Sequence, residues 1–367
     1  MNLCYRALVC RIASAVIACT HTMKSTPALP CAPEHLDEFL SQPTAAVVEF
    51  VRGWTGNVLV LGAGGKMGLH LCLMLQKALS TAGAAARVIA VSRFTTLRDR
   101  SSFEAAGITA IPCDLADAAQ LAALPDAGIV YFLAGLKFGA AAAPETLRLM
   151  NVLVPRAVAE RYRTARIVAF STGCVYPFVS VDSSGATEET RPEPVGDYAI
   201  SCLGREDAFS AASLQHGTPI VLIRLNYSVE FRYGVLVDIA TKVRDAQLVD
   251  VTMGHVNVIW QRDAVDQVIR SLAHASSPAV PLNITGPAVL SVRRIAADFG
   301  RLFGCEPKLV GQEAPTAWLN DAAKSHQLLG VPPTSLETME TWIAAWLLAD
   351  GGTWGKPTGF EKRDGKF

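Results

Sequence analysis

The sequence predicts an α/β fold, with a doubly wound parallel sheet followed by a smaller, mainly helical C-terminal domain. From Asn57 onward, short apolar runs alternate with longer amphipathic ones, which is the pattern of a parallel sheet covered by helices. The apolar runs are continuous, as expected of strands that are buried on both faces. The chain has 367 residues, of which 50% are hydrophobic, enough for one large domain or two coupled ones.

The expected elements follow from these runs. Strands are expected at residues 57–62, 87–92, 109–112, 129–134, 166–171 and 220–225. Helices are expected between them at residues 66–80, 117–124, 144–163 and 198–215. Asp117 is a suitable N-cap, and Pro144 suits a first helical turn. After Leu225 helical patterns dominate, and residues 256–259 are expected to return to the sheet; the later helices are expected at residues 235–246, 263–275, 292–303 and 336–348.

These patterns divide the chain into an N-terminal extension (1–45), a nucleotide-binding domain (46–226), a substrate-binding domain (227–350) and a flexible tail (351–367). Residues 1–22 contain an apolar stretch interrupted by Arg11 and are either a targeting leader or a segment that precedes the natural start at Met23. We favour the second interpretation, or an unstructured extension. No later apolar segment is long enough to cross a bilayer without a charge, so a soluble, cytoplasmic protein is expected.

Charge and cysteine usage exclude several classes of function. Lys plus Arg and Asp plus Glu both total 33, so the chain lacks the basic excess that nucleic acid or an anionic membrane requires. Nine cysteines are scattered without the spacing of a zinc site, and we therefore expect no metal. Most of them are expected to be small core residues in a reducing compartment.

A glycine-rich segment, GAGGKMG at residues 62–68, follows the first strand and opens the first long helix. In a strand–turn–helix unit, the first glycine permits a tight turn, the second admits a diphosphate and the third allows close packing of helix on sheet. The helix N-terminus then offers unpaired N–H groups to the phosphates. The segment therefore predicts binding of NAD or NADP, with the candidate residues Gly62, Gly64, Gly65, Lys66, Met67 and Gly68.

The end of the second strand bears on the choice between the two cofactors. An acidic residue at this place would hydrogen-bond the adenosine ribose of NAD. The chain has Ser92 followed by Arg93, and an arginine offers a cation to a 2′-phosphate. The sequence therefore favours NADP, with NAD as the alternative.

Five segments together resemble the extended short-chain dehydrogenases/reductases, the NAD-dependent epimerase/dehydratase family, over roughly residues 57–348. They are GAGGKMG (62–68), CDLAD (113–117), YFLAGLKFGA (131–140), STGCVYP (171–177) and DYAIS (197–201). The resemblance implies a Rossmann fold, an oxidoreductase or isomerase activity in carbohydrate metabolism, and a homodimer formed through the helices that begin near Pro144 and Tyr198.

The resemblance also implies roles for single residues. Asp114 and Leu115 would flank the adenine, and Ala134, Gly135 and Lys137 would lie along the cofactor. Asn151 would lie beneath the active site and is a candidate for the substrate site.

Two residues match the family's catalytic positions. Thr172 takes the place of the catalytic Ser/Thr, and Tyr198 takes the place of the tyrosine of Y-x-x-x-K. Hydride transfer at a carbinol carbon requires a partner for the hydroxyl proton, and a phenol of lowered pKa can exchange that proton.

The chain departs from the family pattern at Cys202, where the lysine of Y-x-x-x-K is expected. A tyrosine with an ordinary pKa of about 10 is only about 0.1% ionised at pH 7, which would slow the step roughly a thousandfold. The missing charge could come from Lys137, which we favour, from Arg205, or from oxidised nicotinamide. Alternatively, Cys202 is itself an acid/base group, or simply a small packing residue.

Asn226 and Arg232 follow the sixth predicted strand, where the family places substrate contacts. The sequence therefore predicts an NAD(P)-dependent oxidoreductase or epimerase that acts on a hydroxylated sugar-like or sugar-acid substrate. The alternative is a sensor or regulatory protein of the same fold that binds NADP without turnover, because the catalytic lysine is missing.

Overall fold

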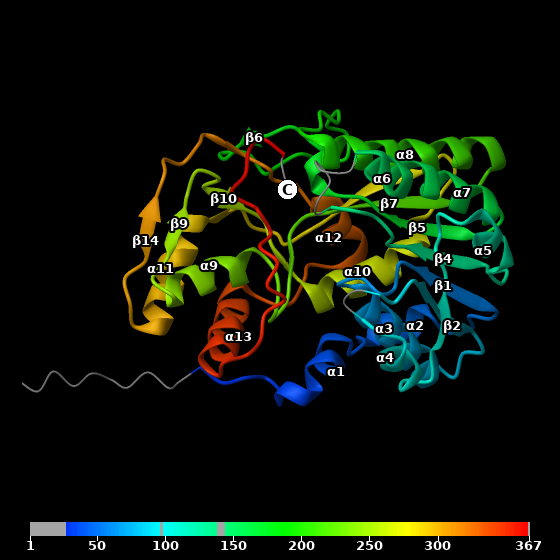
Figure 1. The fold of residues 1–367 in the computed structure, drawn as a ribbon, viewed down its shortest axis with the longest axis horizontal. Helices are drawn as coiled ribbons and strands as arrows, with labels where there is room; N and C mark the ends of the chain where they lie inside the picture. The colour runs from blue at the N-terminus through cyan, green and yellow to red at the C-terminus, as the bar shows by residue number, and fades with distance from the viewer. Residues whose placement is uncertain (1–26, 96–97, 138–143, 366–367) are drawn as a thin grey trace, which may run out of the picture.

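A parallel sheet of seven strands forms the centre of the computed structural model, which describes residues 27–95, 98–137 and 144–365 (Figure 1). The sheet order is β12 (Val280–Ile284), β7 (Ile220–Leu225), β5 (Arg166–Phe170), β4 (Ile129–Phe132), β1 (Asn57–Leu61), β2 (Arg87–Ser92) and β3 (Thr109–Pro112). Each strand pairs in parallel with its neighbours. The chain winds outward from β1 in both directions, which confirms the doubly wound fold.

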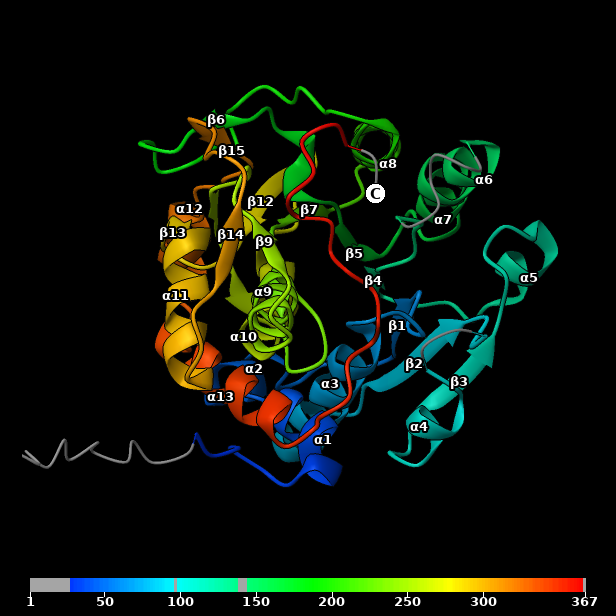
Figure 2. The ribbon, with the colours of Figure 1, turned by 60° about the vertical axis from the view of Figure 1, so that its left-hand side comes forward.

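Helices cover both faces of the sheet, as the buried character of the strands requires. One face carries α2 (Ala45–Phe50), α3 (Gly68–Ala82), α4 (Ser101–Glu104), α10 (Gln261–Ser271) and α12 (Ala323–Leu329). The other carries α5 (Ala118–Ala123), α6 (Pro144–Arg148), α7 (Val154–Arg161) and α8 (Asp197–His216) (Figure 2). Within the described residues, no helix has both the length and the apolar character needed to cross a membrane.

The helix expected at residues 144–163 is interrupted. Between α6 and α7 the chain forms a π-helical segment, η3 (Leu149–Leu153), and Pro155 then lies in the first turn of α7. Proline has no N–H to donate to the preceding turn, so a regular α-helix cannot run through this position. The interruption lies next to α8, and it places Asn151 on the side of the helix that faces α8.

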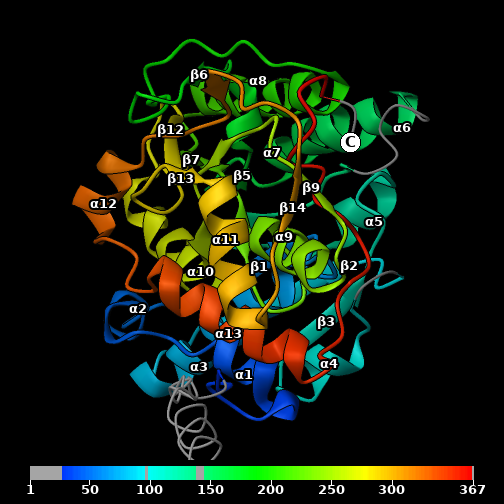
Figure 3. The ribbon, with the colours of Figure 1, turned by 90° about the vertical axis from the view of Figure 1, so that its left-hand side faces the viewer.

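A second hydrophobic core is built mainly from the C-terminal half. It contains α1 (Leu36–Leu40), α9 (Val235–Arg244), α11 (Val292–Phe303) and α13 (Leu336–Leu348), which Figure 3 shows from the side. Short strand pairs connect these helices: β8 (Ser228–Val229) with β11 (Ile259–Trp260), β9 (Leu248–Asp250) with β14 (Lys308–Val310), β10 (His255–Val256) with β13 (Leu290–Ser291), and β6 (Val179–Ser180) with β15 (Thr316–Ala317).

The expectation that residues 256–259 return to the central sheet is wrong. Val256 pairs with β13 and Ile259 with β8, both in small two-stranded pairs. The strand that joins the sheet is β12, beside β7. The helix α10, which precedes it, packs on α3, so residues from within the expected substrate-binding domain complete the sheet layers.

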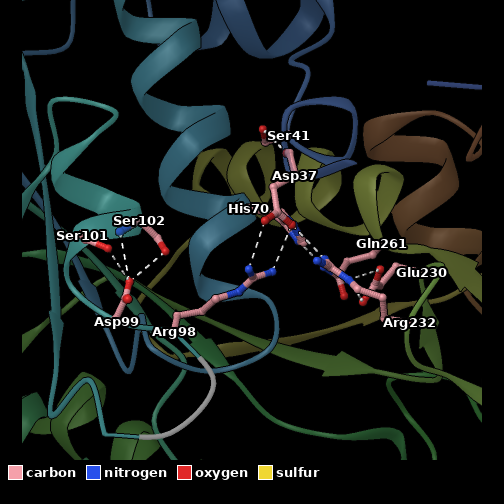
Figure 4. Close-up of polar contacts among 10 residues, drawn as sticks. All are labelled: Asp37, Ser41, His70, Arg98, Asp99, Ser101, Ser102, Glu230, Arg232 and Gln261. Atoms are coloured by element: carbon pink, nitrogen blue, oxygen red, sulfur yellow. Dashed lines mark hydrogen bonds and ion pairs between the residues drawn. The ribbon is translucent and has the colours of Figure 1, made fainter. Parts of the chain in front are cut away.

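The described part of the N-terminal extension is integral to the fold. Leu36 and Leu40 of α1 are buried in the second core. Asp37 accepts hydrogen bonds from His70 of α3 (2.8 Å) and from both Arg98 and Arg232 (2.8–3.0 Å), so it joins three distant segments (Figure 4). These donors hold the pKa of Asp37 well below its usual range. Residues 1–22 lie outside the described residues.

The tail after Gly351, expected to be flexible, packs against the body of the protein. Thr358 and Phe360 are buried, and Arg363 donates to the carbonyl oxygen of Thr316 (2.6 Å). In Figure 2 this segment, in red, runs from α13 past the carboxyl ends of β1, β4, β5 and β7 toward α8. Only a few side chains of this segment are buried, so its composition is polar although the segment is packed against the protein.

One buried carboxyl group makes stability depend on pH. Burial between α11 and α13, with Asp298 nearby, raises the pKa of Glu340 from 4.5 to about 8. Between these two values the unfolded chain ionises while the folded chain stays protonated, so folded stability falls as pH rises. We expect Glu340→Gln to stabilise the protein by about 3–5 kcal/mol above pH 8 and to have little effect near pH 4. Urea unfolding across this range, with the exposed Glu337→Gln as control, measures it; equal stability of Glu340→Gln and wild type at high pH would contradict it.

Candidate active site

A cleft of about 500 Å³ opens at the carboxyl edge of the sheet, between β1 and β4. The strand order reverses at this point, which is where open α/β sheets bind ligands. The cleft is lined by the turn after β1, the loops after β4, β5 and β7, the first turn of α8 and part of the C-terminal tail. Its volume is ordinary for a small-molecule site.

The glycine-rich segment has the geometry expected of a phosphate loop. Gly62 directly follows β1 and has φ +87°, and a Cβ there would meet the backbone of Ala134 at 2.5 Å. Gly68 begins α3, and a Cβ there would overlap the carbonyl group of Ala63. Gly65 lies on the wall of the cleft, where a Cβ would reach only Gly62 O at 3.4 Å. The first and third glycines therefore allow close packing, and the second presents backbone to the cleft.

Lys66 and Lys137 both line this cleft. Lys66 Nζ lies 3.1 Å from the ring centre of Tyr233, and burial together with the charges of Lys137 and Lys356 lowers the pKa of Lys66 to about 7. Burial also lowers the pKa of Lys137, whose Nζ donates to the carbonyl oxygen of Thr358 (3.4 Å). The cleft therefore holds several cations in a poorly solvated space.

The residues predicted to surround the adenosine lie at the ends of β2 and β3, beyond the cleft wall. The Ser92 side chain occupies the space that a Cβ on Gly64 would need, and Arg93 is exposed. Asp114 accepts a hydrogen bond from the backbone of Ala116 (3.0 Å), and Leu115 is buried. Ser92 and Arg93 thus lie at the end of β2, which is where the sequence analysis expects the choice between NAD and NADP to be made.

Thr172 and Tyr198, the predicted catalytic pair, both face the cleft. Thr172 follows β5, and its Oγ1 accepts a hydrogen bond from Cys174 N (3.2 Å). Tyr198 lies in the first turn of α8 and donates to the Cys202 thiol. Burial raises the pKa of Tyr198 well above 10, although the Arg205 charge opposes this rise. The phenol is therefore protonated at neutral pH in the unliganded protein.

Cys202 lies below Tyr198 and outside the lining of the cleft. It packs with Val175, Tyr176 and Ala186, and burial raises the pKa of its thiol. A buried, protonated thiol is poorly suited to exchange protons with a substrate. The geometry therefore supports the packing interpretation of Cys202 and not the acid/base one.

Two cations lie near Tyr198 in place of the missing lysine. Lys137 Nζ is 5.7 Å from the centre of the Tyr198 ring. The Arg205 guanidinium lies beneath Gly135, donates to Phe170 O (2.9 Å) and also lines the cleft. Both candidates from the sequence are thus close to the phenol.

The three predicted substrate residues have different surroundings. Asn226 lines the cleft and donates to Trp318 O (3.3 Å). Asn151 is buried and does not line the cleft. Its amide group makes hydrogen bonds to the backbone N and O of Leu136, donates to the Ser201 hydroxyl and accepts from the Arg205 guanidinium. Asn151 therefore positions the loop after β4 and Arg205, and its contact with a substrate stays a prediction.

Arg232 does not face the cleft either. Its Nε donates to Glu230 (3.1 Å) and its Nη2 donates to Asp37 (2.8 Å), so its charge is committed to the cluster in Figure 4. Of the two carboxylates that bind Arg232, Asp37 is far away in the sequence and Glu230 lies in the same turn. No sequence pattern indicated either contact.

Sequence reasoning missed other residues that line the cleft: Tyr227, Tyr233, Lys356 and Thr358. The two tyrosines follow β7 closely, so their position at a strand end was a usable signal. Lys356 and Thr358 lie far beyond the last recognised motif, in the tail that we expected to be flexible.

Comparisons with known proteins bear on this arrangement. A family model described as the NAD dependent epimerase/dehydratase family matches residues 58–279. No curated protein matches the chain. Solved structures with a similar fold include an epimerase from Methanothermobacter thermautotrophicus (TM-score 0.67, 20% identity, 84% of this chain and 97% of the other). They also include UDP-glucuronic acid 4-epimerase from Bacillus cereus in complex with NAD (0.65, 19%, 79% and 99%) and UDP-glucose 4-epimerase from Thermus thermophilus in complex with NAD (0.64, 18%, 78% and 97%).

The lowered pKa of Lys66 predicts proton uptake on binding of the expected dinucleotide. Lys137 and Lys356 lower this pKa, Asp238 and Glu230 oppose them, and a nearby phosphate would raise it above its unliganded value of about 7. We expect affinity to fall about five- to tenfold as pH rises from about 6.5 to 8.5. Calorimetry in buffers of different ionisation enthalpy measures the uptake. Lys66→Arg should keep the affinity and lose the pH dependence, and an unchanged dependence would contradict the assignment.

Proposed function

Because the chain belongs to the NAD-dependent epimerase/dehydratase family, we propose that it is an NAD(P)-dependent oxidoreductase or epimerase acting on a hydroxylated, sugar-like or sugar-acid substrate. The observation that carries this proposal is the convergence of Thr172 and Tyr198 on the cleft that the phosphate loop lines. The pair and that loop line the same cleft. A substrate hydroxyl and a dinucleotide can therefore share one space.

In the proposed mechanism, nicotinamide supplies hydride acceptance and donation when it is bound. The hydroxyl of Thr172 holds the substrate oxygen, and Tyr198 takes or returns its proton. Asn226 lines the cleft and is proposed to contact the sugar. In an epimerase the ketone stays bound and is reduced on its other face, whereas in a dehydrogenase it leaves.

We propose NADP as the preferred cofactor, with NAD as the alternative. Ser92 supplies no carboxylate at the end of β2, and the exposed Arg93 beside it is available to a 2′-phosphate. The two 4-epimerases described above carry NAD in their structures, so both cofactors belong in the test.

A homodimer and a cytoplasmic location remain predictions. The homodimer is expected from the family resemblance, through the helices that begin near Pro144 and Tyr198; on the second of these, α8, Ile200 and Leu214 expose 55% and 69% of their surface. The cysteines among the described residues are free thiols, which fits a reducing compartment.

The second candidate is a sensor that binds NADP without turnover. The specific observation in its favour is the raised pKa of Tyr198 together with the packed, protonated Cys202. Tight binding of NADPH with no conversion of any sugar or nucleotide sugar would support the sensor. Turnover of one such compound would eliminate it.

The function is tested by incubating the protein with NAD or NADP and a panel of UDP-hexoses, UDP-uronic acids, free sugars and sugar acids. Nicotinamide absorbance reports dehydrogenation, and NMR of the product reports epimerisation. We expect Tyr198→Phe to lower kcat by about 10²–10⁴-fold with little change in cofactor affinity. Tyr162→Phe, whose hydroxyl contacts Pro125 O far from the cleft, is the matched control. Full activity of Tyr198→Phe would refute the assignment.

The role of Lys137 is tested on the pH profile at saturating cofactor. A cation 5.7 Å from the ring favours the ionised phenol, so its loss should raise the pKa that governs kcat by about one unit. We expect this shift in Lys137→Met and its reversal in Lys137→Arg. An unchanged profile in Lys137→Met would assign the charge to another cation, and Arg205, whose charge also acts on the Tyr198 phenol, would be the next candidate.

A further inference from the structure

The C-terminal strap (residues 351–365) is fixed on both sides of its one cleft-lining lysine. Before Lys356, the guanidinium groups of Arg98 and Arg232 lie 5.1 and 5.2 Å from the centre of the Trp354 ring, and Trp354 N donates to Arg232 O (3.1 Å). After it, Thr358 donates to Asp238 through its backbone N (2.7 Å) and its hydroxyl (2.6 Å). The backbone at Lys356 is therefore positioned before any ligand arrives.

Further along, the strap stays attached as far as α8. Phe360 is buried in the second core, and the Arg363 guanidinium lies 4.2 Å from the ring centre of Phe178. Gly365 then packs against Gly196, which directly precedes α8, so closely that neither position has room for a Cβ. The strap thus spans the cleft from α13 to the helix that carries Tyr198.

Three lysines from three separate segments meet in this cleft. Lys66 comes from the phosphate loop, Lys137 from the loop after β4, and Lys356 from the strap. The charges of Lys137 and Lys356 both act on Lys66 strongly enough to lower its pKa. Three cations this close favour a ligand that carries more than one negative charge.

The nearby carboxylates are bound to other groups of the protein. Asp238 accepts the two hydrogen bonds from Thr358, and Glu230 accepts from Arg232 Nε with both of its oxygens (3.1 Å each). Both carboxylates are therefore held in place, and the lysine-lined side of the cleft is where an anion is expected to bind. Because Lys66 belongs to the phosphate loop, that anion is the diphosphate of the dinucleotide rather than that of a nucleotide sugar.

We propose that Lys356 joins Lys66 in binding the diphosphate of the nicotinamide dinucleotide, while Lys137 lies beside Tyr198. The C-terminal strap is then a part of the cofactor site, although it lies outside the segment that matches the family model. This inference rests on the proposed function, because it requires that a dinucleotide binds.

The test compares Lys356→Ala and Lys356→Glu with Lys362→Ala. Lys362 is an exposed lysine of the same strap that does not line the cleft, so its loss removes the same charge from the chain. Fluorescence titration with NADPH and NADH gives the Kd of each variant, and calorimetry with a UDP-hexose gives the Kd for the second source of a diphosphate. Lys356 is exposed, and circular dichroism checks that each variant keeps the fold.

We expect Lys356→Ala to raise the dinucleotide Kd about five- to tenfold and Lys356→Glu to raise it further, whereas Lys362→Ala stays within about twofold. The dependence of Kd on salt should become shallower in Lys356→Ala. The proposal is overturned if Lys356→Ala binds the dinucleotide as well as Lys362→Ala does, if it binds more tightly than wild type, or if only the UDP-hexose loses affinity. Absence of binding by the wild-type protein would instead refute the proposed function.

Discussion

The cleft depends on the close approach of two backbones, where the turn that ends β1 meets the loop that leaves β4. Gly62 adopts φ +87° there, and the backbone of Ala134 occupies the space of any side chain it might carry. From this contact the chain leaves β1 toward one face of the sheet and leaves β4 toward the other. The divergence opens a crevice at the carboxyl edge, and Thr172, Tyr198 and the phosphate loop lie at the ends of the strands and helices that border it.

Low solvation governs the charges within this crevice. Burial lowers the pKa of Lys66 and raises the pKa of Tyr198, so both groups are driven toward their neutral forms in the unliganded protein. A phosphate beside Lys66 and a cation beside Tyr198 act in the opposite direction. Lys66 and Tyr198 therefore become charged most readily when an opposite charge lies beside each of them. Binding of a dinucleotide would favour the charged forms of both the lysine and the phenol. The same argument explains why a fixed strap with one more lysine is useful at the phosphate end.

Sequence reasoning succeeds where structure is local. The strands β1, β2 and β7 are continuous apolar runs, and the phosphate loop combines three glycines whose separate roles the structure explains. It failed for β12, where Pro281 breaks the apolar run; the strand tolerates proline because it lies at the edge of the sheet. It failed again for the strap, where two buried side chains, Thr358 and Phe360, are too few to form a pattern.

Two of the predicted substrate residues lie outside the lining of the cleft for a different reason. Asn151 and Arg232 lie on the expected elements, but their side chains contact residues that are distant in the sequence. Asn151 binds Ser201 and Arg205, and Arg232 binds Asp37. A motif locates a residue on an element of the fold, whereas its contacts depend on which distant segment packs beside it. Asp37, from a segment taken to be an extension, is the clearest example.

The cysteine at position 202 is best understood together with Arg205. Arg205 lies three residues further along α8, buried beneath Gly135, and its guanidinium is held by Asn151 and the carbonyl group of Phe170. A lysine at 202 would place a second buried cation one helical turn away, and like charges in a poorly solvated space repel strongly. Cys202 avoids that repulsion and fills the space against Val175 and Tyr176. The loss of the lysine and the presence of Arg205 are therefore two parts of one arrangement, in which positive charge reaches the Tyr198 phenol from beneath the loop after β4 and from Lys137 on that loop.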